Sequence, residues 1–242
     1  MPAAPADGAT SAVAAPLVAL VAAPAGSELE RLVAIRVPDL VGYQDARYAR
    51  GYAELVERVR AAEAQVLPGS TTLAEAVARH LYKLMAYKDE YEVARLSLDP
   101  AVQATVRAQF GDGARMSYRL HPPVLRAWGM SRKLTLGPWF RPVFGALVAM
   151  RRLRGGRWDL FGYAQVRRVE RALVREYRQV VDELIGSLTP DRHRVAVQIA
   201  ELPDQVRGYE QIKLASVRIY RARLAELQRE LELSVPAGTM PG

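Results

Sequence analysis

From residue 28 onward, hydrophobic residues recur every three or four positions, which is the spacing of amphipathic helices rather than strands. Residues 28–36 predict one short helix, and Pro38 interrupts it. Asp39 has the residue type of an N-cap and is expected to open a helix that runs to about residue 65. The hydrophobic stripe of this helix consists of Tyr48, Tyr52, Leu55, Val56 and Val59.

The next helix has a clear start signal. Thr72 and Glu75 have the spacing of a capping box, in which the hydroxyl and the carboxylate bind free backbone amides. The helical pattern then continues to about Leu98. The pair Asp99-Pro100 suits the N-cap and first position of a short helix that ends near Phe110.

The helical pattern stops in the middle of the chain. Gly111-Asp112-Gly113 is interpreted as a turn, and two short runs of alternating hydrophobic residues follow, around Tyr118 and around Leu134. We expect these runs to pair as one small β-hairpin near residues 115–137. It is the only β structure that the sequence predicts.

Helical spacing resumes after this segment and continues almost to the end of the chain. In the last predicted helix, hydrophobic residues alternate at intervals of three and four, the pattern of a helix packed against another helix. The predicted helices cover residues 138–153, 163–186, a short stretch that Thr189-Pro190 begins, and 205–233.

These elements predict an all-α protein with one small hairpin inserted near its middle. Residues 1–27 contain eleven Ala and four Pro and keep no amphipathic period, so we expect a flexible lead there. Residues 28–233 are expected to form a single helical domain. A frayed tail is expected over 234–242.

Charged residues continue the hydrophobic stripe of the helix that begins near Thr72. The stripe passes through Leu84 and then reaches Lys88 and Arg95. A buried charge is unfavourable unless an opposite charge pairs with it. The segment is therefore a candidate for a buried ion-pair network or, alternatively, for an anion or subunit contact. The candidate residues are Lys88, Asp89, Glu92 and Arg95.

The formal net charge is +8, and Arg carries most of it. Between Arg141 and Arg178 there are ten Arg and three acidic residues, a local surplus of +7. Basic residues that lie beside aromatic ones, such as Trp158, are typical of nucleic-acid contacts, of contacts with an acidic partner, or of a solvated face. The candidate basic patch consists of Arg151, Arg152, Arg154 and Arg157.

Composition excludes several kinds of chemistry on this chain. It has no Cys, so it forms no disulfide, thiol nucleophile or iron–sulfur cluster on its own thiols. It has no Asn either, so Gly111-Asp112-Gly113 cannot begin the magnesium–diphosphate motif of thiamine enzymes. The three His, at 80, 121 and 193, do not have the spacing of a metal pair. The sequence indicates no catalytic, cofactor-binding or metal-ligating residue.

No segment approaches the about 20 apolar residues that span a bilayer. The first basic residue is Arg31, so the basic start of a secretory signal is missing. We expect a cytoplasmic protein that does not contact a membrane.

Several segments together resemble a known family. The segment Lys83 to Leu96 (KLMAYKDEYEVARL) is similar to a hallmark stretch in the C-terminal region of the fused indolepyruvate ferredoxin oxidoreductases. Weaker matches occur in the same order, and together they span about residues 28–231. They are Leu40 to Tyr52, Tyr118 to Pro123, Gly137 to Trp139, Asp159 to Gly162, and Arg207 to Tyr209 with Lys213.

The resemblance implies a role that composition does not show. Members of that family oxidatively decarboxylate aryl 2-oxoacids with thiamine diphosphate, magnesium and iron–sulfur clusters, form an acyl-CoA and reduce ferredoxin. They carry those cofactors in other domains, so the resemblance implies an accessory, non-catalytic helical domain that docks on catalytic partner domains. The alternative is an Arg-rich helical module that binds nucleic acid.

Overall fold

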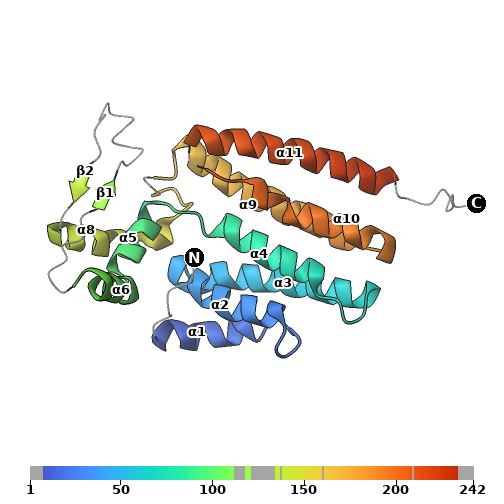
Figure 1. Cartoon of the computed structure of the whole chain (residues 1–242), viewed down its shortest axis with the longest axis horizontal. Helices are drawn as coiled ribbons and strands as arrows, with labels where there is room; N and C mark the ends of the chain where they lie inside the picture. Colours follow the sequence, from blue (N-terminus) through green and yellow to red (C-terminus); the bar gives the residue numbers. More distant parts are fainter. Residues whose placement is uncertain are drawn as a thin grey trace, which may run out of the picture. The chain divides into compact units, whose positions relative to one another are not determined.

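The computed structural model describes residues 8–111, 118–120, 134–136, 138–159, 161–208 and 210–233, and this part of the chain is built almost entirely from helices (Figure 1). The all-α class is therefore confirmed. The α-helices are α1 (Gly8–Val18), α2 (Glu28–Tyr43), α3 (Ala46–Val66), α4 (Thr72–Met85), α5 (Glu90–Leu98), α6 (Pro100–Phe110), α8 (Arg141–Ala149), α9 (Gln165–Gly186), α10 (Pro190–Glu201) and α11 (Glu210–Leu233). Short 3-10 helices are η1 (Pro138–Phe140), η2 (Met150–Leu153) and η3 (Leu202–Gln205).

Two three-residue strands occur where the alternating runs lie. β1 (Tyr118–Leu120) pairs with β2 (Leu134–Leu136) in antiparallel register, with Arg119 opposite Thr135. The residues between the two strands lie outside the described part of the chain. The hairpin expected over 115–137 therefore stays a prediction beyond this short pairing.

The chain divides into two compact units, where the sequence predicts a single domain over 28–233. The predicted tail over 234–242 lies outside the described residues. Unit 1 comprises Met1–Leu17, Ile35–Arg50 and Ala86–Ala172, and unit 2 comprises Val18–Ala34, Gly51–Met85 and Leu173–Gly242.

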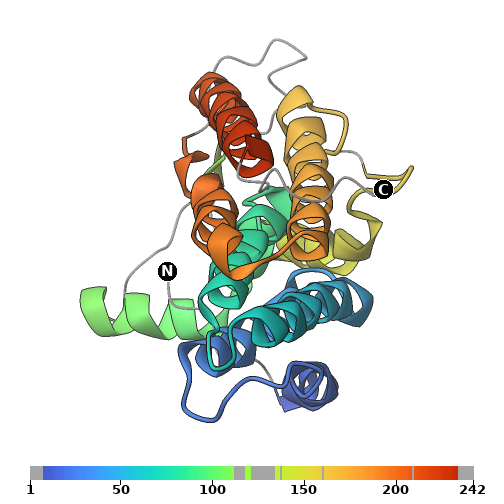
Figure 2. The ribbon, with the colours of Figure 1, turned by 90° about the vertical axis from the view of Figure 1, so that its right-hand side faces the viewer.

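Unit 2 is a helical bundle in which α9, α10 and α11 lie side by side in both views (Figures 1 and 2). Its core is the hydrophobic stripe of each helix, as the helical spacing predicts. Buried tyrosines add hydrogen bonds between helices: the Tyr177 hydroxyl donates to the Ala200 carbonyl at 2.8 Å, and the Tyr52 hydroxyl donates to the Ala78 carbonyl at 3.0 Å. The buried core residues of α3, α4, α9, α10 and α11 include Leu55, Val59, Val77, Leu81, Leu173, Leu184, Ile199, Val217, Tyr220 and Leu227.

Unit 1 is built around the short helix α5, which packs against α8 and α6. Tyr91 and Ala94 of α5 are buried, and so is Phe144 of α8. Phe144 also makes an edge contact with the ring of Phe140 in η1. The aromatic side chains thus fill the space between short helices that are too small to bury a broad hydrophobic face.

Residues 8–18 form helix α1, so the expectation of a flexible lead over 1–27 is wrong for this stretch. Ala14 and Leu17 of α1 are buried, as is Val21 after it. The helix tolerates Pro16 in its last turn. Burial of a few apolar residues stabilises a helix that shows no amphipathic period in the sequence.

The first helical segments also differ from prediction. Pro38 lies inside α2 and does not end it, because the neighbouring Val37 and Leu40 are fully buried and their packing stabilises the continuous helix. Asp39 is consequently not an N-cap. The cap of α3 is Asp45, whose carboxylate accepts the Tyr48 amide at 2.8 Å.

The start of α4 lies where it is predicted, but its capping differs. The amides of Leu73 and Ala74 donate to the two carboxylate oxygens of Glu63, each at 2.9 Å. Glu63 belongs to α3, so a neighbouring helix supplies the cap. The Glu75 carboxylate instead accepts the Thr71 hydroxyl at 2.9 Å.

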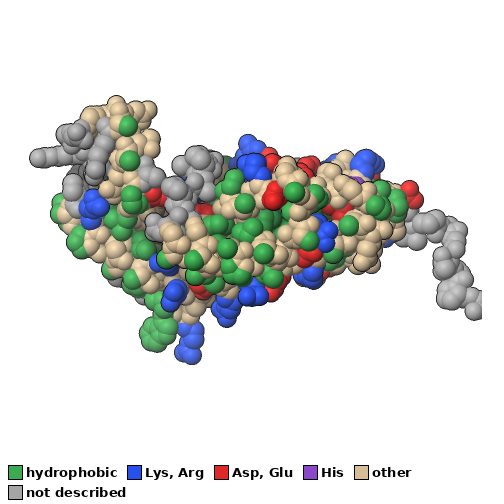
Figure 3. Space-filling model, turned by 90° about the horizontal axis from the view of Figure 1, so that it is seen from below, with side chains coloured by type: hydrophobic (Ala, Val, Ile, Leu, Met, Phe, Trp, Pro, Cys, Tyr) green, Lys and Arg blue, Asp and Glu red, His purple; other side chains and the backbone are tan. Residues whose placement is uncertain are grey.

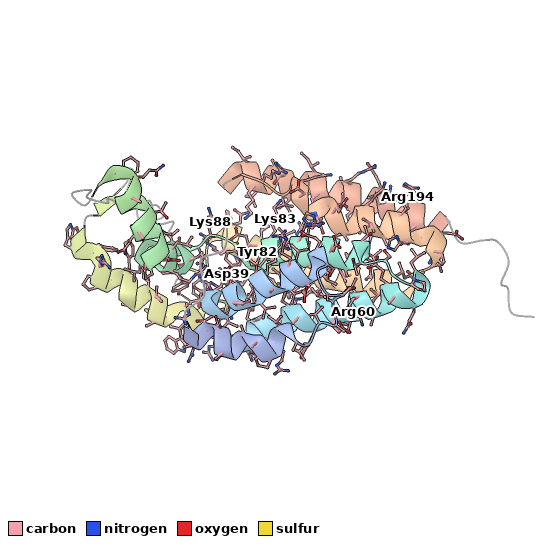
Figure 4. All side chains as sticks on the ribbon, turned by 60° about the horizontal axis from the view of Figure 1, so that its bottom comes forward. Asp39, Arg60, Tyr82, Lys83, Lys88 and Arg194 are labelled. Atoms are coloured by element: carbon pink, nitrogen blue, oxygen red, sulfur yellow. The ribbon has the colours of Figure 1, made fainter. Side chains whose placement is uncertain are left out.

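The helix predicted from Thr72 to Leu98 is two helices. It ends at Met85, residues 86–89 are not helical, and α5 begins at Glu90. This break changes which side chains face the interior. The continuous stripe that reaches Lys88 is therefore wrong, and Lys88 is exposed in the segment between the helices (Figure 4).

Candidate functional site

The strongest concentration of buried charge lies in unit 1, around the start of α5. Asp89 is the N-cap of this helix, and its carboxylate accepts the Glu92 amide at 2.8 Å. The same carboxylate receives Arg154, with Nε 2.5 Å from Oδ2 and Nη2 2.8 Å from Oδ1. Both side chains are only 3% exposed. A bidentate Arg–carboxylate pair of this kind compensates the cost of burying each charge.

Two tyrosines complete the surroundings of Arg154. The guanidinium lies 3.7 Å from the ring centre of Tyr43 and also donates to the Tyr43 carbonyl at 2.5 Å. The Tyr43 hydroxyl donates to the Tyr87 carbonyl at 3.0 Å. Burial raises the pKa of Tyr43 well above its usual value, and the nearby Asp89 charge adds to this shift. Tyr43 therefore stays neutral and acts as a hydrogen-bond donor and an aromatic platform.

A second ion-pair group lies on α5 and α2. Arg95 reaches Glu92 with two hydrogen bonds, at 2.8 and 2.7 Å, and Asp39 of α2 with one at 2.8 Å. Burial lowers the pKa of Arg95, but the hydrogen bonds and charge of Glu92, with Asp39, outweigh it and raise the pKa overall. Arg95 thus holds two acidic side chains that are themselves buried.

A third group links the first turns of α5 and α9. Arg167 lies 2.8 Å from Glu170 and 3.5 Å from Glu90. Burial raises the pKa of Glu90, while the charge of Arg167 opposes that shift. The Glu90 Oε2 atom is buried and makes no hydrogen bond within the described residues. This group is less completely satisfied than the first two.

A buried aspartate organises the described residues of the loop before α9, 154–159 and 161–164. Asp159 accepts the amides of Gly155 at 2.7 Å and Gly162 at 3.1 Å, and it accepts the Tyr91 hydroxyl at 3.1 Å. Arg171 lies 3.6 Å from the same carboxylate. Four groups from three segments therefore fix the inner side of this loop.

The structure brings together three of the four charged candidates on α5. Asp89 and Glu92 are buried, and Arg95 is partly buried. Asp89 pairs with Arg154, while Arg95 pairs with both Glu92 and Asp39. Lys88 is exposed because the helix breaks after Met85.

The four candidates of the basic patch do not share one environment. Arg152 and Arg157 are exposed, Arg151 is partly buried, and Arg154 is fully buried in its pair with Asp89. The expectation that Arg154 belongs to a surface patch is therefore wrong. On the face drawn in Figure 3, Lys and Arg side chains lie among Asp and Glu side chains.

Sequence reasoning misses Tyr43 and Asp159 as members of the charged network. Nothing in the helical pattern around Tyr43 marks it as a partner of a charged residue, and its partner Arg154 lies 111 residues further along the chain. Asp159 does have a local signal, because it lies between Gly155-Gly156 and Gly162. Glycines that flank an acidic residue are typical of a loop whose amides turn toward a carboxylate.

Among the described residues of unit 2, Glu63 forms a buried acidic centre. Glu63 accepts the two α4 amides, the Ser70 hydroxyl at 2.7 Å and His193 Nε2 at 2.7 Å. Burial alone raises the pKa of Glu63, but the hydrogen bonds from Leu73, Ala74, Ser70 and His193 together lower it. These contacts join α3 to α4, to α10 and to the connection between α3 and α4, so Glu63 holds elements of unit 2 together.

These arrangements hold charges in fixed pairs. The carboxylates of Asp89, Glu92 and Asp159 already accept hydrogen bonds from arginine, tyrosine or backbone donors. Within the described ranges, no group of three or more His, Asp or Glu side chains has an arrangement that could hold a metal ion. Proton transfer needs an accessible acid or base, whereas these three carboxylates are buried.

Among the helices of the described residues, none is long and apolar enough to cross a bilayer. The cytoplasmic location stays a prediction.

Comparison with known proteins identifies one family. Residues 29–226, most of the chain, match a family of unknown function, DUF6537. No curated protein and no solved structure matches the chain. The matched residues include α5 and every ion pair around Arg154, Arg95 and Arg167. The chain is a member of the DUF6537 family.

Proposed function

We propose that this chain is an accessory, non-catalytic helical domain of an indolepyruvate ferredoxin oxidoreductase, or of a closely related 2-oxoacid ferredoxin oxidoreductase. It docks on the domains that carry thiamine diphosphate, magnesium and the iron–sulfur clusters. Those cofactors perform the redox chemistry, and this chain contributes a helical scaffold.

One observation carries this proposal. The segment with the most specific resemblance, Lys83 to Leu96, contains the N-cap Asp89 and its neighbours Glu92 and Arg95. These residues form the ion pairs at the centre of unit 1. The segment that resembles the oxidoreductase region therefore contains residues whose ion pairs stabilise unit 1.

The extents of the two similarities also agree. The resemblance spans about residues 28–231, and the family match spans 29–226. Both similarities therefore cover most of the two compact units together. This supports a discrete accessory domain, with the catalytic domains on another part of the assembly.

The nucleic-acid alternative depends on the Arg141–Arg178 surplus. Within that range, Arg154 and Arg167 are already committed to buried acidic partners, and Arg171 lies near the buried Asp159. Fewer positive charges are therefore free to face a phosphate backbone than the sequence suggests. The alternative predicts an affinity whose logarithm falls steeply with the logarithm of salt concentration.

The proposal is tested by mixing purified chain with the purified thiamine- and iron–sulfur-bearing polypeptide of an indolepyruvate ferredoxin oxidoreductase from the same cell. We expect one complex on size-exclusion chromatography, and a parallel titration with oligonucleotide at about 50 mM salt should show no binding. Separate elution of the two proteins, together with oligonucleotide binding, contradicts the proposal and favours the nucleic-acid module.

A further inference from the structure

Two large aromatic side chains of the loop before α9 are exposed to solvent instead of packing in the interior. Trp158 is 76% exposed and Tyr163 is 68% exposed. Large aromatic rings usually lie partly buried, and two exposed rings on one short loop indicate a contact surface. Arg157, next to Trp158, is exposed as well. We call Arg157, Trp158 and Tyr163 the aromatic loop surface.

Hydrogen bonds hold the inner side of the loop that carries this surface. Asp159, only 3% exposed, holds the amides of Gly155 and Gly162. Arg171 donates to the Gly162 carbonyl at 2.6 Å, which closes the loop against the first turns of α9. A surface that is already ordered loses little conformational entropy when it binds.

The exposed side of the loop is also ordered. The Tyr163 hydroxyl donates to the Arg157 carbonyl at 3.0 Å, so these two positions are tied across the loop. Gly155 has φ of +75°, a backbone conformation that other residues rarely adopt. The conformation that presents Trp158 is thus determined by hydrogen bonds and by one glycine.

The charge of the segment indicates what it contacts. From Arg151 to Tyr163, the only acidic residue is Asp159, which is buried. Arg152 and Arg157 remain exposed, so this stretch presents positive charge and no exposed negative charge. Trp, Tyr and Arg are the residue types that dominate binding energy at protein–protein interfaces.

We propose that the aromatic loop surface is the main contact through which this domain binds an acidic protein surface on the catalytic domains. Trp158 enters an apolar pocket of the partner, and Arg157 pairs with carboxylates at the rim of that pocket. The inference depends on the proposed function, because it takes the partner from there.

The test compares variants of the full chain for binding to the purified thiamine- and iron–sulfur-bearing polypeptide. We expect Trp158→Ala to weaken the affinity at least about tenfold. Arg157→Glu should weaken it by a similar factor and reduce its dependence on salt. Both side chains are exposed, so thermal unfolding of the two variants should match that of the wild-type chain.

Trp139→Ala is the matched control. Trp139 is 70% exposed and belongs to the same unit, but it lies in η1, away from the loop in sequence. We expect its affinity to stay within about twofold of the wild-type value. Equal losses for Trp139→Ala and Trp158→Ala would show a general loss of exposed aromatics, which overturns the inference.

The outcomes separate this inference from the proposed function. If the wild-type chain binds and both loop variants bind equally well, the loop inference is wrong and the proposed function stands. If the wild-type chain does not bind the catalytic polypeptide, both are wrong. If Trp158→Ala weakens binding to a single-stranded oligonucleotide and leaves the catalytic polypeptide unaffected, the loop belongs to a nucleic-acid site.

Discussion

Arg154 and Asp89 form a buried bidentate ion pair between residues that lie 65 positions apart in the chain. Asp89 also caps α5, so one carboxylate both begins a helix and neutralises a buried guanidinium. The pair ties the loop that follows η2 to the segment with the strongest resemblance. We regard it as the central structural feature of unit 1.

Removal of Arg154 should therefore leave a buried, unpaired carboxylate. We expect Arg154→Met to lower the free energy of unfolding by about 3–5 kcal/mol, measured by urea denaturation. Arg152→Met removes an exposed arginine two positions away and should change stability by less than about 0.5 kcal/mol. Equal stability of the two variants would show that the ion pair contributes nothing.

A double variant separates loss of the pair from loss of the side chain. Asp89→Asn keeps a residue type that caps helices but removes the negative charge. The double variant Asp89→Asn/Arg154→Met lacks both charges of the pair, so neither charge is left buried without its partner. We expect this double variant to be less destabilised than the sum of the two single variants, by about 1–3 kcal/mol.

Glu63 should make the stability of unit 2 depend on pH. Its pKa is lower in the folded chain than the ordinary value of 4.5, so its contribution is fully present above pH 4.5 and is lost as pH falls below that value. Glu63→Gln should cost about 1–3 kcal/mol near neutral pH. This difference from the wild-type chain should shrink as pH falls.

The measurement is the unfolding free energy of both proteins in urea, from about pH 7 down to about pH 3. Glu232→Gln, at an exposed glutamate of α11 in the same unit, is the control and should change stability little at any pH. A Glu63→Gln effect that stays constant over the whole range would contradict the assigned direction of the pKa shift.

A substitution at Gly162 tests whether the network around Asp159 holds the aromatic loop surface in place. A Cβ at this position would lie 2.5 Å from Asp159 Oδ2 and 2.8 Å from Arg171 Nη1, both of which belong to the network under the loop. We expect Gly162→Ala to cost about 1–3 kcal/mol and to accelerate amide hydrogen exchange over residues 155–163.

Gly145→Ala provides the comparison for that variant. A Cβ at Gly145 meets nothing within 4 Å, and the residue lies inside α8. Alanine should stabilise that helix by up to about 1 kcal/mol. Unchanged exchange in the 155–163 loop of Gly162→Ala would mean that the loop is not held by Asp159.

Lys83 anchors the 3-10 helix η3 in unit 2. Its ammonium group donates to the carbonyls of Pro203 and Asp204 at 3.0 and 2.9 Å, and it lies 3.2 Å from the Asp204 carboxylate. Lys83→Met should lower stability by about 1–2 kcal/mol and increase amide exchange over residues 202–208. If amide exchange over residues 202–208 in Lys83→Met equals that of the wild-type chain, Lys83 does not hold η3 in place.

The sequence predicts the long helices well, because periodicity and capping residues report them directly. α9 and α10 begin within a few residues of their predicted starts, and Pro190 lies at the first turn of α10 as Thr189-Pro190 indicates. Errors occur where packing overrides a local signal. Pro38 does not end α2, since Val37 and Leu40 beside it are buried.

The site is harder to predict than the helices. Lys88 and Arg95 are singled out from their place in the stripe, and Asp89 and Glu92 as acidic residues near them, but Lys88 is misplaced because nothing in the pattern marks the break after Met85. The partner of Asp89 is Arg154, and that of Arg95 is Asp39, 56 residues away. Pairings over such distances depend on the packing of helices, which one sequence does not reveal.

The central claim is that this domain acts together with a separate redox centre. The most direct measurement is affinity purification of the tagged full chain from its native cell, followed by an assay of the captured polypeptide for thiamine diphosphate and iron–sulfur absorbance. We predict a brown, thiamine-containing partner and no ferredoxin reduction by the chain alone with indolepyruvate and CoA. Indolepyruvate oxidation by the isolated chain would contradict the account.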